Sequence, residues 1–150
     1  MLRDAGATPE QIASHPHPFY TPIATFGPEY RMMPVAFGLK FAGLLSGARL
    51  VKADLTQTLQ ATGVDATAYA AKLASGETAV IVLNKDASRD LELTLDFGSG
   101  KSGSVSLETL HAPALDSREA RIDPGKGRAL SGGKVTLPVP RASGVRISLA

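Results

Sequence analysis

The sequence predicts a mainly β protein, an antiparallel β-sandwich preceded by one apolar helix. From Arg49 onward, short runs alternate between apolar and polar residues. Turn-forming residues separate these runs at roughly 8 to 15 positions, a spacing typical of sandwiches. A continuous apolar run with helical character lies upstream, after Met33. With 43% apolar and 20% charged residues, the composition is that of a globular domain.

Residues 1–33 are expected to form an irregular loop. Prolines stand at positions 9, 16, 18, 22 and 28, and Gly6 and Gly27 also interrupt any periodic pattern. Proline lacks the backbone N–H that a helix interior or a central strand needs. This density of proline therefore argues against a long helix or a central strand.

A helix is predicted from Pro34 to Leu45. Proline is favourable in a first helical turn, and Ser46 and Gly47 provide a stop signal. Lys40 is the only charged residue in this span. Because a helix that is apolar on nearly every face is normally buried, we expect it to lie between two layers.

Seven segments have the pattern of strands, which is enough for two sheets. In Leu91–Phe97 the four apolar residues at odd positions should face the core, whereas Glu92, Thr94 and Asp96 should face water. The glycine-rich segments Gly125–Arg128 and Ser131–Lys134 are interpreted as turns. The predicted strands are Leu50–Leu55, Thr67–Leu73, Thr78–Asn84, Leu91–Phe97, Ser104–Leu110, Lys134–Val139 and Val145–Leu149.

Composition and motifs argue against several classes of function. The 16 basic and 14 acidic residues are scattered, whereas nucleic-acid binding favours clustered cations with stacking aromatics. No apolar stretch reaches the roughly 18 residues of a membrane span, and no export signal is visible, which leaves the compartment open. Phosphate-binding, zinc-protease and nucleophile-elbow motifs are not found. We therefore expect no cofactor and no metal.

No residue of the chain has the setting of a catalytic group. Glycoside hydrolysis usually needs two carboxylates at the ends of barrel strands, and the glutamates here lie in turns, on polar strand faces or in loops. Glu29 precedes the helix and is expected to complement its dipole. The histidines, including the His15-Pro16-His17 pair, are interpreted as loop residues. The glutamates are Glu10, Glu29, Glu77, Glu92, Glu108 and Glu119, and the third histidine is His111.

Aromatic residues are scarce in the sandwich region. It contains no tryptophan, and only Tyr69 and Phe97 are aromatic. Both fall on predicted strands, where core packing would account for them. Because lectin-like sites generally hold sugar rings on exposed aromatic faces, the composition argues against such binding.

Several segments resemble glycoside hydrolase family 79, the β-glucuronidase and heparanase-like enzymes. Tyr20-Thr21-Pro22-Ile23 and Arg31–Ala42 are similar to the end of its catalytic barrel. Ala79–Lys85 resembles a sandwich strand that ends in an Asn-Lys turn. Leu110–Leu115 and Leu137–Ser143 resemble later sandwich segments. Met1–Pro18 departs from the family pattern.

The resemblance implies a retaining enzyme, often exported, of which this chain is the C-terminal part. Residues 1–47 would be a loop and a remnant of the last βα unit of a (β/α)8 barrel, and residues 48–150 the accessory sandwich. The barrel domain of the parent enzyme would be the partner, with glycoside substrate bound only in the complete enzyme. Its catalytic glutamates have no counterpart here, so the chain alone should be inactive. Tyr20 would line the sugar subsite and recognise the uronate carboxylate. The alternative is a free-standing β-sandwich module with a structural or carbohydrate-binding role.

Overall fold

The computed structural model describes residues 21–26, 28–52, 62–114 and 116–150, and in these the protein is mainly β, as predicted. Its largest element is a six-stranded antiparallel sheet in the order β3-β4-β5-β10-β7-β8. The bounds of these strands are β3 Arg49–Val51, β4 Ala66–Lys72, β5 Thr78–Asn84, β7 Ser104–His111, β8 Arg121–Ala129 and β10 Ser143–Leu149.

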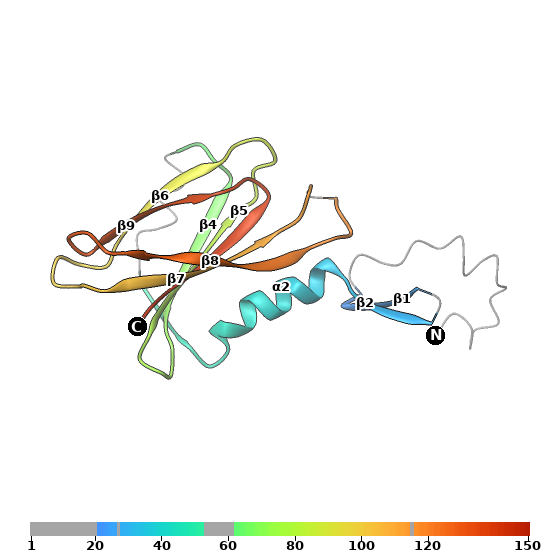
Figure 1. The fold of residues 1–150 in the computed structure, drawn as a ribbon, viewed down its shortest axis with the longest axis horizontal. Helices are drawn as coiled ribbons and strands as arrows, with labels where there is room; N and C mark the ends of the chain where they lie inside the picture. Colours follow the sequence, from blue (N-terminus) through green and yellow to red (C-terminus); the bar gives the residue numbers. More distant parts are fainter. Residues whose placement is uncertain (1–20, 27, 53–61, 115) are drawn as a thin grey trace.

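A second, two-stranded antiparallel sheet is formed by β6 (Leu91–Asp96) and β9 (Lys134–Val139) (Figure 1). One hydrophobic core joins side chains of β6 and β9 to side chains of β4, β5, β7 and β10. The fold is therefore a sandwich, with the core between a large and a small sheet. Among the described helices, none is long and apolar enough to cross a membrane.

The alternation predicted for β6 is confirmed. Leu91, Leu93 and Leu95 are buried, and the polar residues between them are exposed. Phe97 is partly buried against the same core. On β9, Val135, Leu137 and Val139 alternate in the same way opposite β6.

Two segments predicted to be irregular are strands. Ile23–Phe26 (β1) and Glu29–Met32 (β2) pair as a hairpin, so the loop expected for residues 1–33 is corrected there. Prolines 22 and 28 lie just outside the two strands, where no ladder hydrogen bond is required of them.

The segment Gly125–Arg128 lies within β8 and is not a turn. β8 is an edge strand and most of its residues are exposed, so apolar alternation gave no signal. Edge strands tolerate proline and glycine, and β8 contains Pro124. Glycine is required at 125, where an added Cβ would lie 2.8 Å from Leu107 Cβ. The β7–β8 ladder has its register shift between Val105 and Leu107, beside this contact.

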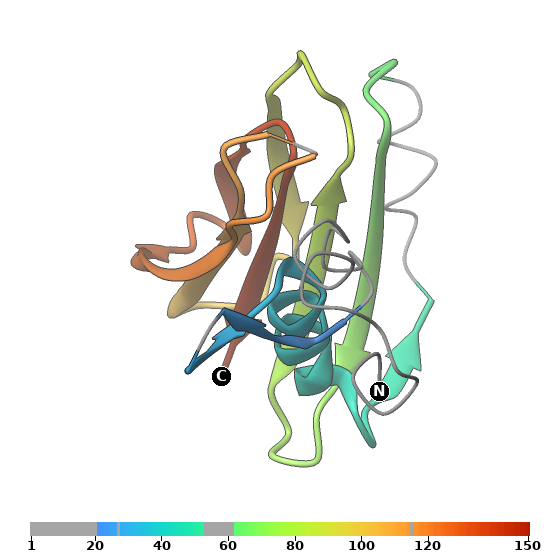
Figure 2. The ribbon, with the colours of Figure 1, turned by 90° about the vertical axis from the view of Figure 1, so that its right-hand side faces the viewer.

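The predicted helix forms as α2 (Pro34–Ala42), followed by a 3₁₀ turn, η1 (Gly43–Leu45). It is not buried between two layers: it contacts β7 and β8 on the side of the large sheet away from β6 and β9 (Figure 2). Phe41 is 2% exposed, whereas Leu39 is 61% exposed. Only one face of an apolar helix is therefore covered.

Candidate functional site

The predicted sugar-binding residue, Tyr20, lies outside the described residues. Its role therefore remains a prediction. Glu10, His15 and His17 also fall outside them.

The described glutamates do not form a catalytic pair. Glu77 accepts a hydrogen bond from Ser75 at 3.0 Å. Glu29 lies on β2 and pairs with Arg31 at 3.2 Å. The first turn of α2 has no acidic residue, so the expected interaction of Glu29 with the helix dipole is wrong. Glu108, on β7, is partly exposed and is ion-paired with the largely buried Arg146.

Arg146 connects α2 to the outer face of the large sheet, the face turned away from β6 and β9. Its Nη1 donates a hydrogen bond to the carbonyl oxygen of Phe41 at 3.4 Å, and its Cζ lies 5.7 Å from the centre of the Phe41 ring. Gly144 makes room for that ring, since an added Cβ would lie 3.1 Å from Phe41 Cε1. Burial lowers the pKa of the Arg146 guanidinium from its ordinary value, but arginine stays charged at neutral pH.

On β3 and β4, two large apolar side chains of the outer face are exposed. Tyr69 on β4 is 49% exposed and Leu50 on β3 is 66% exposed. The expectation that Tyr69 is a core residue is therefore wrong. Tyr69 pairs with Ile81 and belongs to the face opposite Ala68 and Ala70, which enter the core. We call Leu39, Leu50 and Tyr69, together with the partly exposed apolar side chains of α2, the outer patch.

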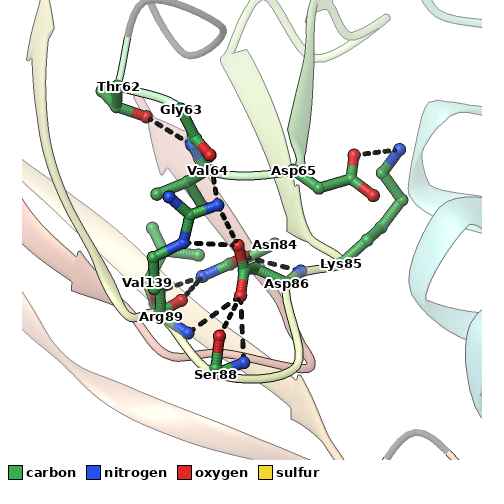
Figure 3. Close-up of polar contacts among 10 residues, drawn as sticks. All are labelled: Thr62, Gly63, Val64, Asp65, Asn84, Lys85, Asp86, Ser88, Arg89 and Val139. Carbon is green, nitrogen blue, oxygen red and sulfur yellow. Dashed lines mark hydrogen bonds and ion pairs between the residues drawn. The ribbon is translucent and has the colours of Figure 1, made fainter.

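A polar network fixes the loop that follows β5 (Figure 3). The side-chain amide of Asn84, which is 1% exposed, donates to the carbonyl oxygens of Arg89 at 2.9 Å and Val139 at 3.1 Å. Asn84 lies on the large sheet and Val139 on the small one. The amide therefore ties the two sheets together at this end of the sandwich.

Asp86 organises the same loop. Its carboxylate accepts hydrogen bonds from the backbone N–H groups of Ser88 and Arg89 at 2.9 and 3.0 Å and pairs with the Arg89 guanidinium at 2.7 Å. These hydrogen bonds hold the pKa of Asp86 well below its ordinary value. The bond from the Ser88 N–H makes the largest contribution to this shift. The Arg89 side chain also donates to the carbonyl oxygen of Gly63. Asp followed two residues later by Ser is a turn signal that could have identified this loop from sequence.

Beside this network the loops enclose a hollow of about 600 Å³. Its walls come from the segments after β5, β7 and β9 and combine small apolar residues and prolines with three charged side chains. Arg141 donates its backbone N–H to Asp90 at 2.9 Å, but its guanidinium comes only within 4.0 Å of that carboxylate. The lining residues are Ala87, Asp90, Ala112, Pro113, Ala114, Asp116, Pro140, Arg141 and Ala142.

His111 lies near this hollow, on the β7–β8 hairpin. Its Nε2 is 2.7 Å from Asp123 Oδ2, and Arg121 Nε lies 2.8 Å from the same oxygen. The hydrogen bond with His111, followed by that with Arg121, lowers the pKa of Asp123. In the described part of the chain no three side chains are grouped as metal ligands. The expectation that His111 is simply a loop residue is wrong, because it ends strand β7 and takes part in a hydrogen-bond network with Asp123 and Arg121.

No family model and no curated protein matches the sequence, but solved structures share the fold. The GH51 arabinofuranosidase from Xanthomonas axonopodis pv. citri has a TM-score of 0.67 at 17% identity, over 86% of this chain and 28% of that one. The GH51 alpha-L-arabinofuranosidase from Thermotoga petrophila RKU-1 has a TM-score of 0.51 at 14% identity, over 57% of this chain and 19% of that one. The protein thus spans less than a third of each of these two neighbours.

The first of these matches reaches beyond the sandwich. Residues 48–150 are 103 of the 150 residues, and a match over 86% of the chain must extend into residues 1–47. The shared fold therefore includes part of the segment that carries the β1–β2 hairpin and α2.

Proposed function

We propose that this protein is the C-terminal accessory sandwich of a glycoside hydrolase and that its outer patch packs against the catalytic barrel domain of that enzyme. The observation that carries the proposal is the half-covered outer face. Phe41 and Arg146 fix α2 to the sheet, while Leu39, Leu50 and Tyr69 remain exposed around it. Monomers rarely leave contiguous apolar patches uncovered unless another surface binds there.

The fold comparison supports the same assignment. Both named neighbours are glycoside hydrolases, and each is several times longer than the matched portion. In this proposal the uncovered remainder corresponds to a catalytic domain. Residues 1–47 would then contribute the last βα unit of that domain.

The finer assignment is a retaining enzyme of the β-glucuronidase type in family 79. Its support is the sequence resemblance at Arg31–Ala42, Ala79–Lys85 and Leu137–Ser143. Tyr20 would recognise the uronate carboxylate, since a phenol donates a hydrogen bond while its ring packs on a sugar. The two carboxylates of a retaining mechanism would come from the barrel.

The DNA upstream of the Met1 codon tests the proposal. An in-frame continuation that encodes barrel strands and two catalytic glutamates is expected, and the longer protein should hydrolyse an aryl β-glucuronide. The 150-residue chain should not raise hydrolysis above the buffer rate. Turnover by this chain that is abolished by a single Glu→Gln change would overturn the proposal.

A further inference from the structure

The hollow beside Asp86 is separate from the outer patch. It lies at the end of the large sheet where Asn84, Ser143 and His111 align across β5, β10 and β7. Its volume of about 600 Å³ falls within the roughly 300–1,000 Å³ of small-molecule sites. The hollow is therefore large enough for a small molecule. The residues that line it determine which chemical class of ligand it would bind.

Two of the three walls of the hollow, the loops after β5 and after β9, are joined by hydrogen bonds. The Ala142 N–H donates to the Asp86 carbonyl oxygen at 3.0 Å, which joins the loop after β9 to the loop after β5. The hydrogen bond from the Arg141 N–H to Asp90 is a second link between the same loops. Ser143 Oγ donates to the Pro140 carbonyl oxygen at 2.6 Å. These bonds fix the position of the loops after β5 and β9 before a ligand binds, which favours affinity on that side of the hollow.

Ala142 has a backbone conformation that needs an explanation. Its φ is 49°, and among the described residues other than glycine it is the only one with positive φ. Such a conformation costs about 1–3 kcal/mol and is common where a binding surface constrains the chain. Ala142 lies in the turn that joins β9 to β10, and this turn, with Arg141 and Ala142, lines the hollow.

The charged groups of the hollow are open to a ligand. The Arg141 guanidinium has five N–H donors and makes only the 4.0 Å approach to Asp90 within the described residues. Among these residues, none pairs with Asp116. The three charged side chains sum to a net negative charge, which disfavours an anion.

We propose that this hollow binds a neutral saccharide. Sugar hydroxyls both donate and accept, so they can bond to Arg141 and to the carboxylates of Asp90 and Asp116 together. The C–H faces of the ring would pack on Pro113 and Pro140 in the absence of an aromatic platform. The sequence argued against lectin-like binding because the sandwich region has no tryptophan and its two aromatic residues were expected in the core, but this site needs no aromatic platform. The proposal goes beyond the accessory role and does not depend on a barrel domain.

The test uses the full chain and three neutral probes, xylotriose, arabinotriose and maltotriose, with trigalacturonate as an anionic trimer of matched length. Backbone amide shifts are followed by NMR during titration. At least one neutral probe should shift the amides of Ala87, Ala112 and Ala142, with saturation at millimolar concentration. Arg141→Ala should weaken that binding about tenfold or more, the loss of hydrogen bonds to a charged group, and Asp116→Asn should weaken it less.

Arg49→Ala is the matched control. It removes the same charge from an exposed position on β3, at the opposite end of the sheet, and should bind as the unsubstituted chain does. Arg141→Ala should keep its fold because the Arg141 side chain is mostly exposed; an unchanged spectrum away from the hollow verifies this. Shifts confined elsewhere, tighter binding of trigalacturonate, or no shift with any neutral trimer would each overturn the proposal.

Discussion

The inner face of the six-stranded sheet packs against β6 and β9, whereas its outer face packs against a single helix. The inner face contributes to a continuous apolar core in which Val82, Val105 and Ile147 are fully buried. The outer face mixes an ion pair, a glycine that makes room for Phe41 and exposed apolar side chains. The inner face is a complete domain core. The outer face is only partly covered, and in the proposed function it is the face that the barrel domain would cover.

The largest expected effect tests the inner face. The Leu95 side chain, on β6, is buried in the core between the two sheets. Leu95→Ala should therefore lower the free energy of unfolding by about 2–5 kcal/mol. Thr94→Ala should cost less than about 1 kcal/mol, because the Thr94 side chain faces water and its hydroxyl bonds to that of Thr136 at the surface. Urea denaturation of both variants measures this. Equal effects at the two positions would contradict the register of β6.

A smaller effect is expected at the junction of α2 with the outer face. Arg146→Ala removes the ion pair with Glu108, the hydrogen bond to the Phe41 carbonyl and the contact with its ring. The cost should be about 1–3 kcal/mol, the range for a lost hydrogen bond that leaves its partner unsatisfied. Urea denaturation again measures it, with Arg49→Ala, an exposed arginine on β3, as the control. No difference between the two variants would show that α2 is not held by Arg146.

Sequence alone could predict the inner face but not the outer one. Alternation in Leu91–Phe97 and Lys134–Val139 follows directly from burial on one side of a strand. β8 was not predicted because an exposed edge strand has no such alternation. The β1–β2 hairpin was not predicted because the prolines at its ends indicated a loop. Tyr69 could not be assigned to the outer face, since both faces of β4 carry alanine and only the pairing with β5 distinguishes them.

The residues that line the proposed saccharide site were even harder to predict from the sequence. Asp90, Arg141 and Asp116 come from three loops far apart in sequence, and only the pairing of β5, β10 and β7 brings them to one end of the sheet. The turn signal at Asp86 and Ser88 was present in the sequence. This signal indicated a turn, but it did not indicate that the turn forms one wall of the hollow.

The loop that Asp86 organises supplies a pH-dependent test at the end of the sandwich. The pKa of Asp86 is lowered in the folded protein, so folding is favoured by the ionised form. This contribution should be complete above the unfolded pKa, about 4, and lost as the pH falls toward the folded value. Asp86→Asn should therefore be clearly less stable than the unsubstituted chain at about pH 7, and the gap should be narrower at about pH 3.

The control for this pH effect is Asp65→Asn. Asp65 makes an exposed ion pair with Lys85 at 2.8 Å, and exposed pairs contribute about 0–1 kcal/mol. Urea midpoints of the three proteins at both pH values give the comparison. A gap between Asp86→Asn and the unsubstituted chain that is the same at both pH values would show that the carboxylate charge does not stabilise the loop.

The smallest effect on stability, and the most direct test of the outer patch, is expected at Leu39. Because its side chain is mostly exposed on α2, Leu39→Gln should change the free energy of unfolding by no more than about 0.5 kcal/mol. The same change should reduce self-association, since an uncovered apolar patch is where copies of the chain would adhere. Static light scattering and titration with a hydrophobic dye, at equal protein concentrations, measure both properties. Glu92→Gln is the control, because Glu92 is exposed on β6, on the opposite side of the sandwich.

The distinction between a complete inner face and an uncovered outer face is wrong if the unsubstituted chain is monomeric and does not bind the dye. In that case the outer face is complete as it stands, α2 belongs to a self-contained domain, and no barrel is needed to cover it.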